Sequence, residues 1–157
     1  MRARALLAAC GAFLAAVVWM DLMFDVQAMG DAVGSLPPAA LASIAAYYRR
    51  VTTDAFPMGR LIALVMLVAI AGAVWGVARR ERRALDWVAL ALAVGPIGLA
   101  GGRVVPNAVR LGSDTDTLAA KSALAHLIAC DHVLCFLAIA GFAVTQVVLA
   151  GQSRRPG

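Results

Sequence analysis

The sequence contains few residues of the kinds that build metal, redox or disulfide sites. It has three cysteines and two histidines in 157 residues, with no Cys-x-x-Cys, Glu-x-x-His or His-x-x-x-His spacing. Such spacings are typical of zinc and di-iron sites. Both histidines fall in one apolar run, so a haem would need a second ligand that the other runs do not supply. We therefore expect no metal, no cofactor and no disulfide, and we interpret the cysteines as small packing residues.

A polar segment long enough for a soluble domain is also missing. Hydrophobic residues make up 62% of the chain and the mean hydropathy is +0.84, whereas globular proteins average about 45–50% apolar residues. Four apolar runs are long enough to cross about 30 Å of hydrocarbon, at residues 5–26, 58–78, 84–102 and 118–150. The sequence predicts an all-α fold, in which residues 1–157 form a single integral membrane four-helix bundle in the lipid bilayer.

Basic residues are numerous, but they form no patch typical of nucleic-acid binding. The formal net charge is +5, and eight arginines lie near the termini or in the short loop after the second run: Arg2, Arg4, Arg79, Arg80, Arg82, Arg83, Arg154 and Arg155. Basic residues in short loops stay on the cytoplasmic side. We therefore expect a multi-pass protein of a bacterial inner membrane, with both termini cytoplasmic and no nucleic-acid partner.

The start of the chain has features of two processing signals. A basic start and an apolar run precede Val26-Gln27-Ala28, which weakly resembles a cleavage site, and Leu7-Ala8-Ala9-Cys10 resembles a lipid-attachment motif. Cleavage would remove the first span with its aspartates. The apolar stretch before Cys10 is shorter than the usual length of about 7–15 residues. We expect the first run to remain as a membrane span.

The long loop between the first two runs has its own pattern. From Ala39 to Asp54, apolar residues recur at helical spacing, and Pro38 suits the start of a helix. We expect a short amphipathic helix in this first external loop, lying at the outer interface, in preference to a solvated connector. After the third run we expect a loop from Val104 to Thr117.

Small residues crowd the third run around Pro96: Gly95, Gly98, Gly101 and Gly102. Small residues let membrane helices approach closely. We therefore expect these glycines to pack against neighbouring helices, and we expect Pro96 to kink its own helix.

Ionisable residues inside apolar runs are costly, at about 2.5–3.5 kcal/mol each, and often mark function. Asp21 and Asp25 are four residues apart in the first run, so they share one helix face. The fourth run contributes three such residues, and the ends of the second and third runs contribute one each: His126, Asp131, His132, Arg60 and Arg103. We expect these side chains to turn inward in the outer half of the bundle, and we expect the inner half to be almost purely apolar.

This polar set has two main interpretations. In the first, Asp21 or Asp131 holds Arg60 or Arg103 in an ion-pair network that satisfies charges which lipid cannot solvate. In the second, the carboxylates and imidazoles face a ligand or reaction pocket and act as general bases. A metal site is less favoured because the ligand spacings are missing. A proton relay is less favoured because the inner half offers no polar path.

Three short motifs follow one another along the chain: Tyr47-Tyr48-Arg49-Arg50-Val51-Thr52, Val105-Pro106-Asn107-Ala108-Val109-Arg110-Leu111, and His126 with Asp131-His132. This order resembles the anthrone oxygenase-like family of small four-helix membrane proteins. The resemblance implies a cofactor-free reaction in which a base takes an acidic C–H proton and the carbanion reacts with oxygen. It implies His126 or His132 as the base, Asp131 as the residue that orients it, and Asn107 or Arg110 near the oxyanion.

We therefore predict an oxygenase-like enzyme or a binder of a lipophilic small molecule. The predicted catalytic residues are His126, Asp131 and His132, and the predicted ligand-binding residues are Asp21, Asp25, Arg60, Arg103, Asn107 and Arg110. The alternative is a non-enzymatic membrane subunit that helps to assemble or regulate a larger complex. Its polar groups would then pair within the bundle, with a membrane protein partner or with another copy of this chain.

The predicted topology can be tested by cysteine labelling from outside the cell. In a background without the native cysteines, an impermeant reagent is expected to modify Ser35→Cys and to spare Ser153→Cys. The reason is that arginine-rich short loops hold their side of the protein in the cytoplasm. Labelling of the second position alone would reverse the topology.

Overall fold

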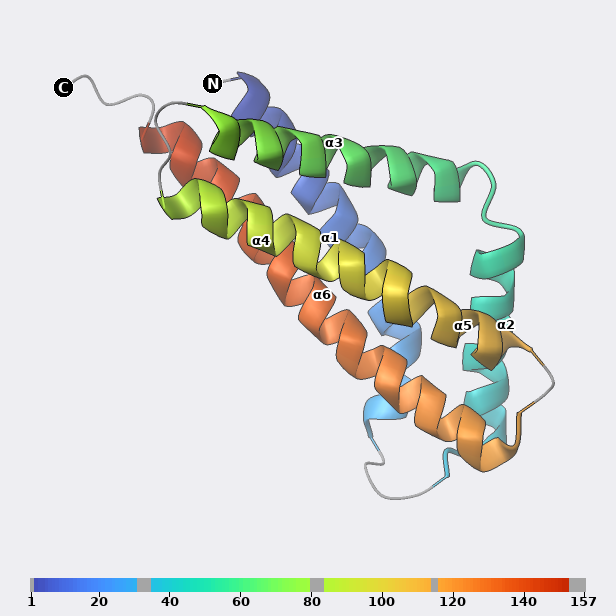
Figure 1. Ribbon diagram of the computed structural model, residues 1–157. Helices are drawn as coiled ribbons and strands as arrows, with labels where there is room; N and C mark the ends of the chain where they lie inside the picture. Colours follow the sequence, from blue (N-terminus) through green and yellow to red (C-terminus); the bar gives the residue numbers. More distant parts are fainter. Residues whose placement is uncertain (1, 31–34, 80–83, 114–115, 153–157) are drawn as a thin grey trace.

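The computed structural model describes residues 2–30, 35–79, 84–113 and 116–152, and these ranges contain helices but no strand (Figure 1). The helices are α1 (Arg2–Met29), α2 (Pro38–Thr53), α3 (Met58–Ala78), α4 (Ala84–Leu99), the π-helical turn η1 (Ala100–Val104), α5 (Val105–Gly112) and α6 (Leu118–Gln152). Five of the arginines used to predict the orientation lie outside the described residues: Arg80, Arg82, Arg83, Arg154 and Arg155.

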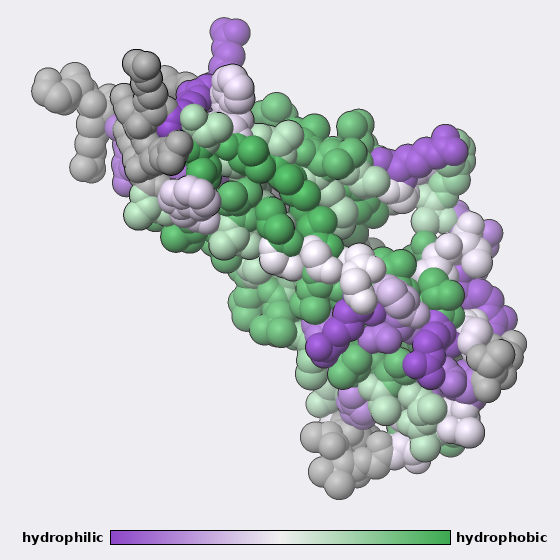
Figure 2. Space-filling model, viewed as in Figure 1, coloured by the Kyte–Doolittle hydropathy of each residue, from purple (hydrophilic) through white to green (hydrophobic). Residues whose placement is uncertain are grey.

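Four helical stretches in the described ranges are long and apolar enough to cross a membrane. They are α1, α3, the continuous stretch Ala84–Gly112, and α6. Their outward surfaces are apolar: Leu67, Trp75 and Leu137 are largely exposed, and Figure 2 shows hydrophobic side chains over α3 and α4. Lipid suits such a surface better than water does. The chain is therefore a helical, multi-pass membrane protein.

The helix α6 packs along both α1 and α4, and α3 contacts the same two helices. The start of α1 and the end of α6 lie at one end of the molecule, whereas α2 and α5 contact each other at the opposite end (Figure 1). Each end has its own core. The core nearer the termini is rich in alanine, and its buried residues include Ala69, Ala73, Ala89, Ala93 and Phe142. The core near α2 is built from larger residues, including Leu36, Leu41, Ile44, Leu111 and Ile128.

The helix α2 occupies the segment in which the sequence predicts an amphipathic helix. Pro38 lies in its first turn, where a missing N–H costs no hydrogen bond. Leu41, Ile44 and Tyr48 are buried, on a helix that contacts α5, α1 and α6, while Arg49 is exposed. The helix therefore closes one end of the molecule with its apolar side turned inward.

The third membrane-length stretch continues further than the sequence predicts. Instead of a loop from Val104, the turn η1 and the helix α5 carry the chain on to Gly112. Pro106 lies in the first turn of α5, where its fixed backbone angle suits a helix. A proline in this position does not end the helical stretch, which explains why the expected boundary came too early.

Two expectations about interior packing are wrong. A Cβ added to any of the four glycines of the third run would meet no neighbouring atom within 4 Å: Gly95, Gly98, Gly101 and Gly102. Cys130, which was expected to pack inside, is exposed on α6. Close approach occurs instead at Gly11 of α1, where an added Cβ would lie 2.9 Å from the Cβ of Ala143 on α6.

Gly11→Ala is therefore expected to destabilise the protein. Its methyl group would collide with Ala143, and overpacking of this kind costs about 1–3 kcal/mol. Gly98→Ala is the matched control, because it adds a methyl group in open space and alanine is the better helix former. Thermal unfolding of both purified variants in one detergent measures the difference. An equal loss of Tm in both variants would contradict the close contact between α1 and α6.

Candidate functional site

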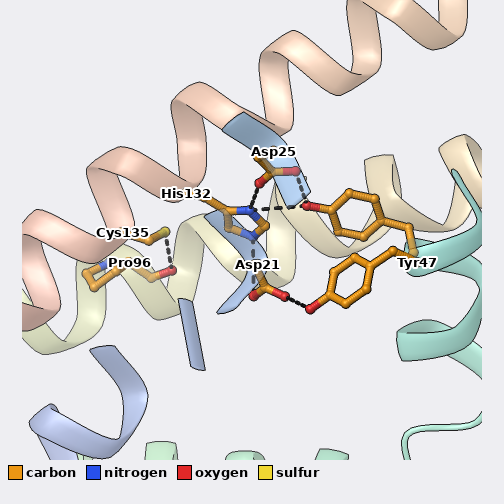
Figure 3. Close-up of polar contacts among 7 residues, drawn as sticks. Asp21, Asp25, Tyr47, Pro96, His132 and Cys135 are labelled. Carbon is orange, nitrogen blue, oxygen red and sulfur yellow. Dashed lines mark hydrogen bonds and ion pairs between the residues drawn. The ribbon is translucent and has the colours of Figure 1, made fainter. Parts of the chain in front are cut away.

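The polar side chains near α2 converge where α1, α2 and α6 meet (Figure 3). Asp21 and Asp25 lie one turn apart on the same side of α1. Tyr47 and Tyr48 reach them from α2, and His132 reaches them from α6. Residues far apart in the sequence thus form one hydrogen-bonded cluster.

Asp25 lies at the centre of this cluster and is 0% exposed. Its Oδ2 lies 2.6 Å from Nδ1 of His132, and its Oδ1 accepts a 2.6 Å hydrogen bond from the hydroxyl of Tyr48. A buried carboxylate without such donors would be strongly unfavourable. Because an ionised carboxylate only accepts hydrogen bonds, its contact with His132 requires a proton on Nδ1. In the neutral imidazole, the lone pair is then on Nε2.

The other ring nitrogen of His132 faces a second carboxylate. Nε2 lies 3.9 Å from Oδ2 of Asp21, which is longer than a hydrogen bond. Oδ1 of Asp21 accepts a 2.5 Å hydrogen bond from the hydroxyl of Tyr47, whose ring stacks on Phe24 with the centroids 3.9 Å apart. His132 is therefore held closely by Asp25 and separated by a gap from Asp21.

The two phenols act as hydrogen-bond donors in this cluster. Burial raises the pKa of Tyr47 and Tyr48 well above the usual value, and the carboxylates of Asp21 and Asp25 raise it further. A phenolate here would be desolvated and repelled by its neighbours. Both side chains therefore stay protonated over the physiological range and are poor candidates for a catalytic base.

Four members of the cluster line a cleft of about 550 Å³: Asp21, Tyr47, Tyr48 and His132. The remaining lining is mostly apolar and comes from all seven helical elements of the described residues, including Val18, Met58, Ile62, Met66, Ile97 and Ile139. This volume falls within the range of small-molecule pockets, about 300–1,000 Å³. The cluster is the polar wall of an otherwise apolar cleft, which is the usual composition of a ligand site.

The structure brings three of the predicted site residues together, Asp21, Asp25 and His132. Asp131, which was expected to orient a histidine, has another partner: its Oδ2 lies 2.8 Å from Nε of Arg103 in η1. Adjacent helix residues point about 100° apart, so Asp131 and His132 face different neighbours. The carboxylate that orients His132 is that of Asp25.

Four other predicted residues lie outside the cleft. The guanidinium carbon of Arg60 lies 4.8 Å from the centroid of the Phe56 ring. The exposed Arg110 forms an ion pair with Asp116, with a nitrogen–oxygen distance of 3.2 Å. Neither Asn107 nor His126 belongs to the cleft lining. Nε2 of His126 is buried, with no hydrogen-bond partner in the described part of the chain. The structure therefore leaves one histidine at the cleft, His132.

The sequence predicts that the half of the bundle away from this cluster is almost purely apolar, and that prediction is wrong. Arg4 forms an ion pair with the buried Asp86 of α4 and donates a 2.9 Å hydrogen bond to the fully buried Gln146 of α6. Gly76 of α3 leaves room for this network, because a Cβ there would lie 3.1 Å from Oδ1 of Asp86. Sequence reasoning treated Arg4 only as a flanking charge and assigned no role to Asp86 or Gln146.

Sequence reasoning also assigned no role in the site to Tyr47 and Tyr48. A signal was present, because the helical pattern places Tyr48 among the apolar positions of its segment. A buried tyrosine hydroxyl needs a hydrogen-bond partner, and Asp21 and Asp25 are acceptors on one face of a neighbouring helix. The pair was therefore a candidate for the site.

No family model, curated protein or solved structure matches this chain. Within the ranges that the structure describes, no group of three or more His, Cys, Asp or Glu side chains is arranged to hold a metal ion. Function is therefore inferred from the geometry of the cleft and of its polar wall.

The chain contains two tyrosines, so phenolate absorbance reports on Tyr47 and Tyr48 alone. Their pKa values are raised in the folded state. The native protein should therefore show little phenolate about one unit above the ordinary pKa of about 10, where the unfolded chain is largely ionised. The stability that these groups contribute is fully present below that ordinary pKa and is lost as the pH rises above it. Ultraviolet titration of native and denatured protein measures the phenol pKa in each state. A native titration centred near the ordinary value would contradict the buried cluster.

Proposed function

We propose that the chain is a four-helix bundle of a bacterial inner membrane that binds a lipophilic small molecule in the cleft and takes a proton from it at His132. In this proposal both termini are cytoplasmic and α2 lies at the outer interface. The proposal is supported by the shared position of the start of α1 and the end of α6, opposite α2 (Figure 1).

The pair of Asp25 and His132 carries this proposal. The buried carboxylate holds Nδ1 at 2.6 Å, which sets the orientation of the ring and its tautomer. Nε2 is then the nitrogen that accepts a proton, and His132 lines the cleft. A carboxylate in the position of Asp25 also stabilises the imidazolium that forms. These are the features of a general base in which a carboxylate holds one ring nitrogen, Nδ1, and leaves the other, Nε2, to accept the proton.

The proposed reaction is the oxygenase-like one that the family resemblance implies. His132 takes an acidic C–H proton from the substrate, and the resulting carbanion adds to molecular oxygen with formation of a C–O bond. The peroxide anion takes the proton back from His132, and the hydroperoxide loses water to give the quinone. The apolar lining favours a lipophilic substrate and limits the access of water to the carbanion. Asn107 and Arg110 lie outside the cleft, whereas the phenols of Tyr47 and Tyr48 belong to its lining beside His132. The proposal involves no cofactor.

Two substitutions on α6 test this function. In His132→Asn, the amide can still donate to Asp25 but the Nε2 base is lost, so anthrone oxidation, measured by oxygen uptake and quinone absorbance, should fall by about 10²–10⁴-fold. Asp131→Asn is the matched control. It should lower the Tm, because it weakens the ion pair with Arg103, while activity per folded molecule is retained.

Two results would contradict the proposal. In the first, wild-type protein neither oxidises anthrone nor binds any member of a panel of lipophilic aromatics. In the second, His132→Asn oxidises anthrone at the wild-type rate. A large fall in Tm for Asp131→Asn together with the first result would favour the structural alternative, a non-enzymatic membrane subunit whose polar residues form an ion-pair network.

A further inference from the structure

The polar wall of the cleft carries more acidic than basic groups. Asp21 lines the cleft, and the fully buried Asp25 lies behind it in the same hydrogen-bonded cluster. Arg50 and Asp54 also belong to the described lining. Both are exposed, and their charges offset each other. Even when His132 carries a proton, the carboxylates of Asp21 and Asp25 leave the wall with an excess negative charge.

The arginine of η1, Arg103, does not neutralise this charge. Arg103 of η1 is paired with Asp131 at 2.8 Å, and neither residue belongs to the lining of the cleft. The excess charge is therefore concentrated at Asp21 and Asp25, next to apolar surface. A low dielectric strengthens the field of a charge in such a place.

Asp21 is the point at which this charge faces the cleft. Its Oδ1 accepts the hydrogen bond from Tyr47, whereas Oδ2 has Nε2 of His132 at 3.9 Å. No hydrogen bond to Oδ2 occurs among the residues that the structure describes. The side chain of Asp21 is 20% exposed, in contrast to the fully buried Asp25. Figure 3 shows its carboxylate between His132 and Tyr47. An acceptor in an apolar cleft is unfavourable unless a donor reaches it.

We propose that the molecule bound in the cleft is a lipophilic cation, whose protonated amine pairs with Oδ2 of Asp21 and whose apolar body lies against the methionines and isoleucines of the lining. This inference rests on the proposed function of the cleft as a binding site, but not on the reaction at His132. An ammonium group supplies both the missing donor and the opposite charge, and charge-assisted hydrogen bonds are about twice as strong as neutral ones. A carboxylate ligand would instead be repelled by Asp21 and Asp25.

Three probes of the same shape test the inference: naphthylmethylamine, naphthylmethanol and naphthoate. They are cationic, neutral and anionic near neutral pH, and their binding is measured by equilibrium dialysis against the full chain in nanodiscs of zwitterionic lipid. Empty nanodiscs correct for partitioning into lipid. The amine is expected to bind wild-type protein about tenfold more tightly than the alcohol, and the naphthoate is expected to bind more weakly than either.

The variant Asp21→Asn removes the charge but keeps an oxygen that can accept from Tyr47. It should bind the amine and the alcohol equally, whereas Asp131→Asn, outside the cleft, should keep the preference of wild-type protein. If Asp21→Asn does not fold, the order of affinities in wild-type protein decides alone. Equal or tighter binding of the alcohol or the naphthoate by wild-type protein, or an unchanged preference in Asp21→Asn, would overturn the cation proposal and leave the cleft as a binding site. Binding of none of the three probes would overturn the cation proposal, and the proposed function would fall with it only if wild-type protein also failed to oxidise anthrone.

Discussion

A carboxylate buried inside a membrane protein must receive hydrogen bonds from the protein, because lipid supplies none. Asp25 meets this constraint with donors from two other helices, Tyr48 of α2 and His132 of α6. The same contacts hold α2 across the ends of α1 and α6, and they orient the imidazole at the cleft. The position of α2 and the chemistry of the cleft therefore depend on one buried carboxylate, that of Asp25.

The two polar networks lie at opposite ends of the molecule and bracket its alanine-rich core. Between membrane helices the hydrophobic effect gives little attraction, because lipid tails are as apolar as the side chains. Close backbone contact at Gly11 and the network of Arg4, Asp86 and Gln146 hold the terminal end. The cluster around Asp25 holds the other. The helices α1 and α6 take part in both networks, so their position along each other is fixed at two separate places.

The sequence predicts the membrane-length helices well because length and apolarity are local properties. It also predicts that Asp21 and Asp25 share a face, since four-residue spacing decides this within one helix. Partners across helices are harder to predict, because they depend on how each helix is rotated about its axis. For that reason Asp131 meets Arg103 rather than the histidine, and Asp25 takes the orienting position. Gln146 was overlooked because a single amide hardly changes the hydropathy of a long run.

The π-helical turn η1 affects how the fold tolerates the loss of a residue during evolution. Such a turn closes its hydrogen bonds over one residue more than an α-helix does, and each residue of a helix advances by about 100°. A deletion of one codon within residues 100–104 can be absorbed, because the wide turn would close into an α-helical one, and α5 would keep its phase with Ala108 and Leu111 in their buried positions. The turn is therefore the place in the stretch Ala84–Gly112 where the loss of one residue changes the phase of the helix least, and the glycines of η1 face open space.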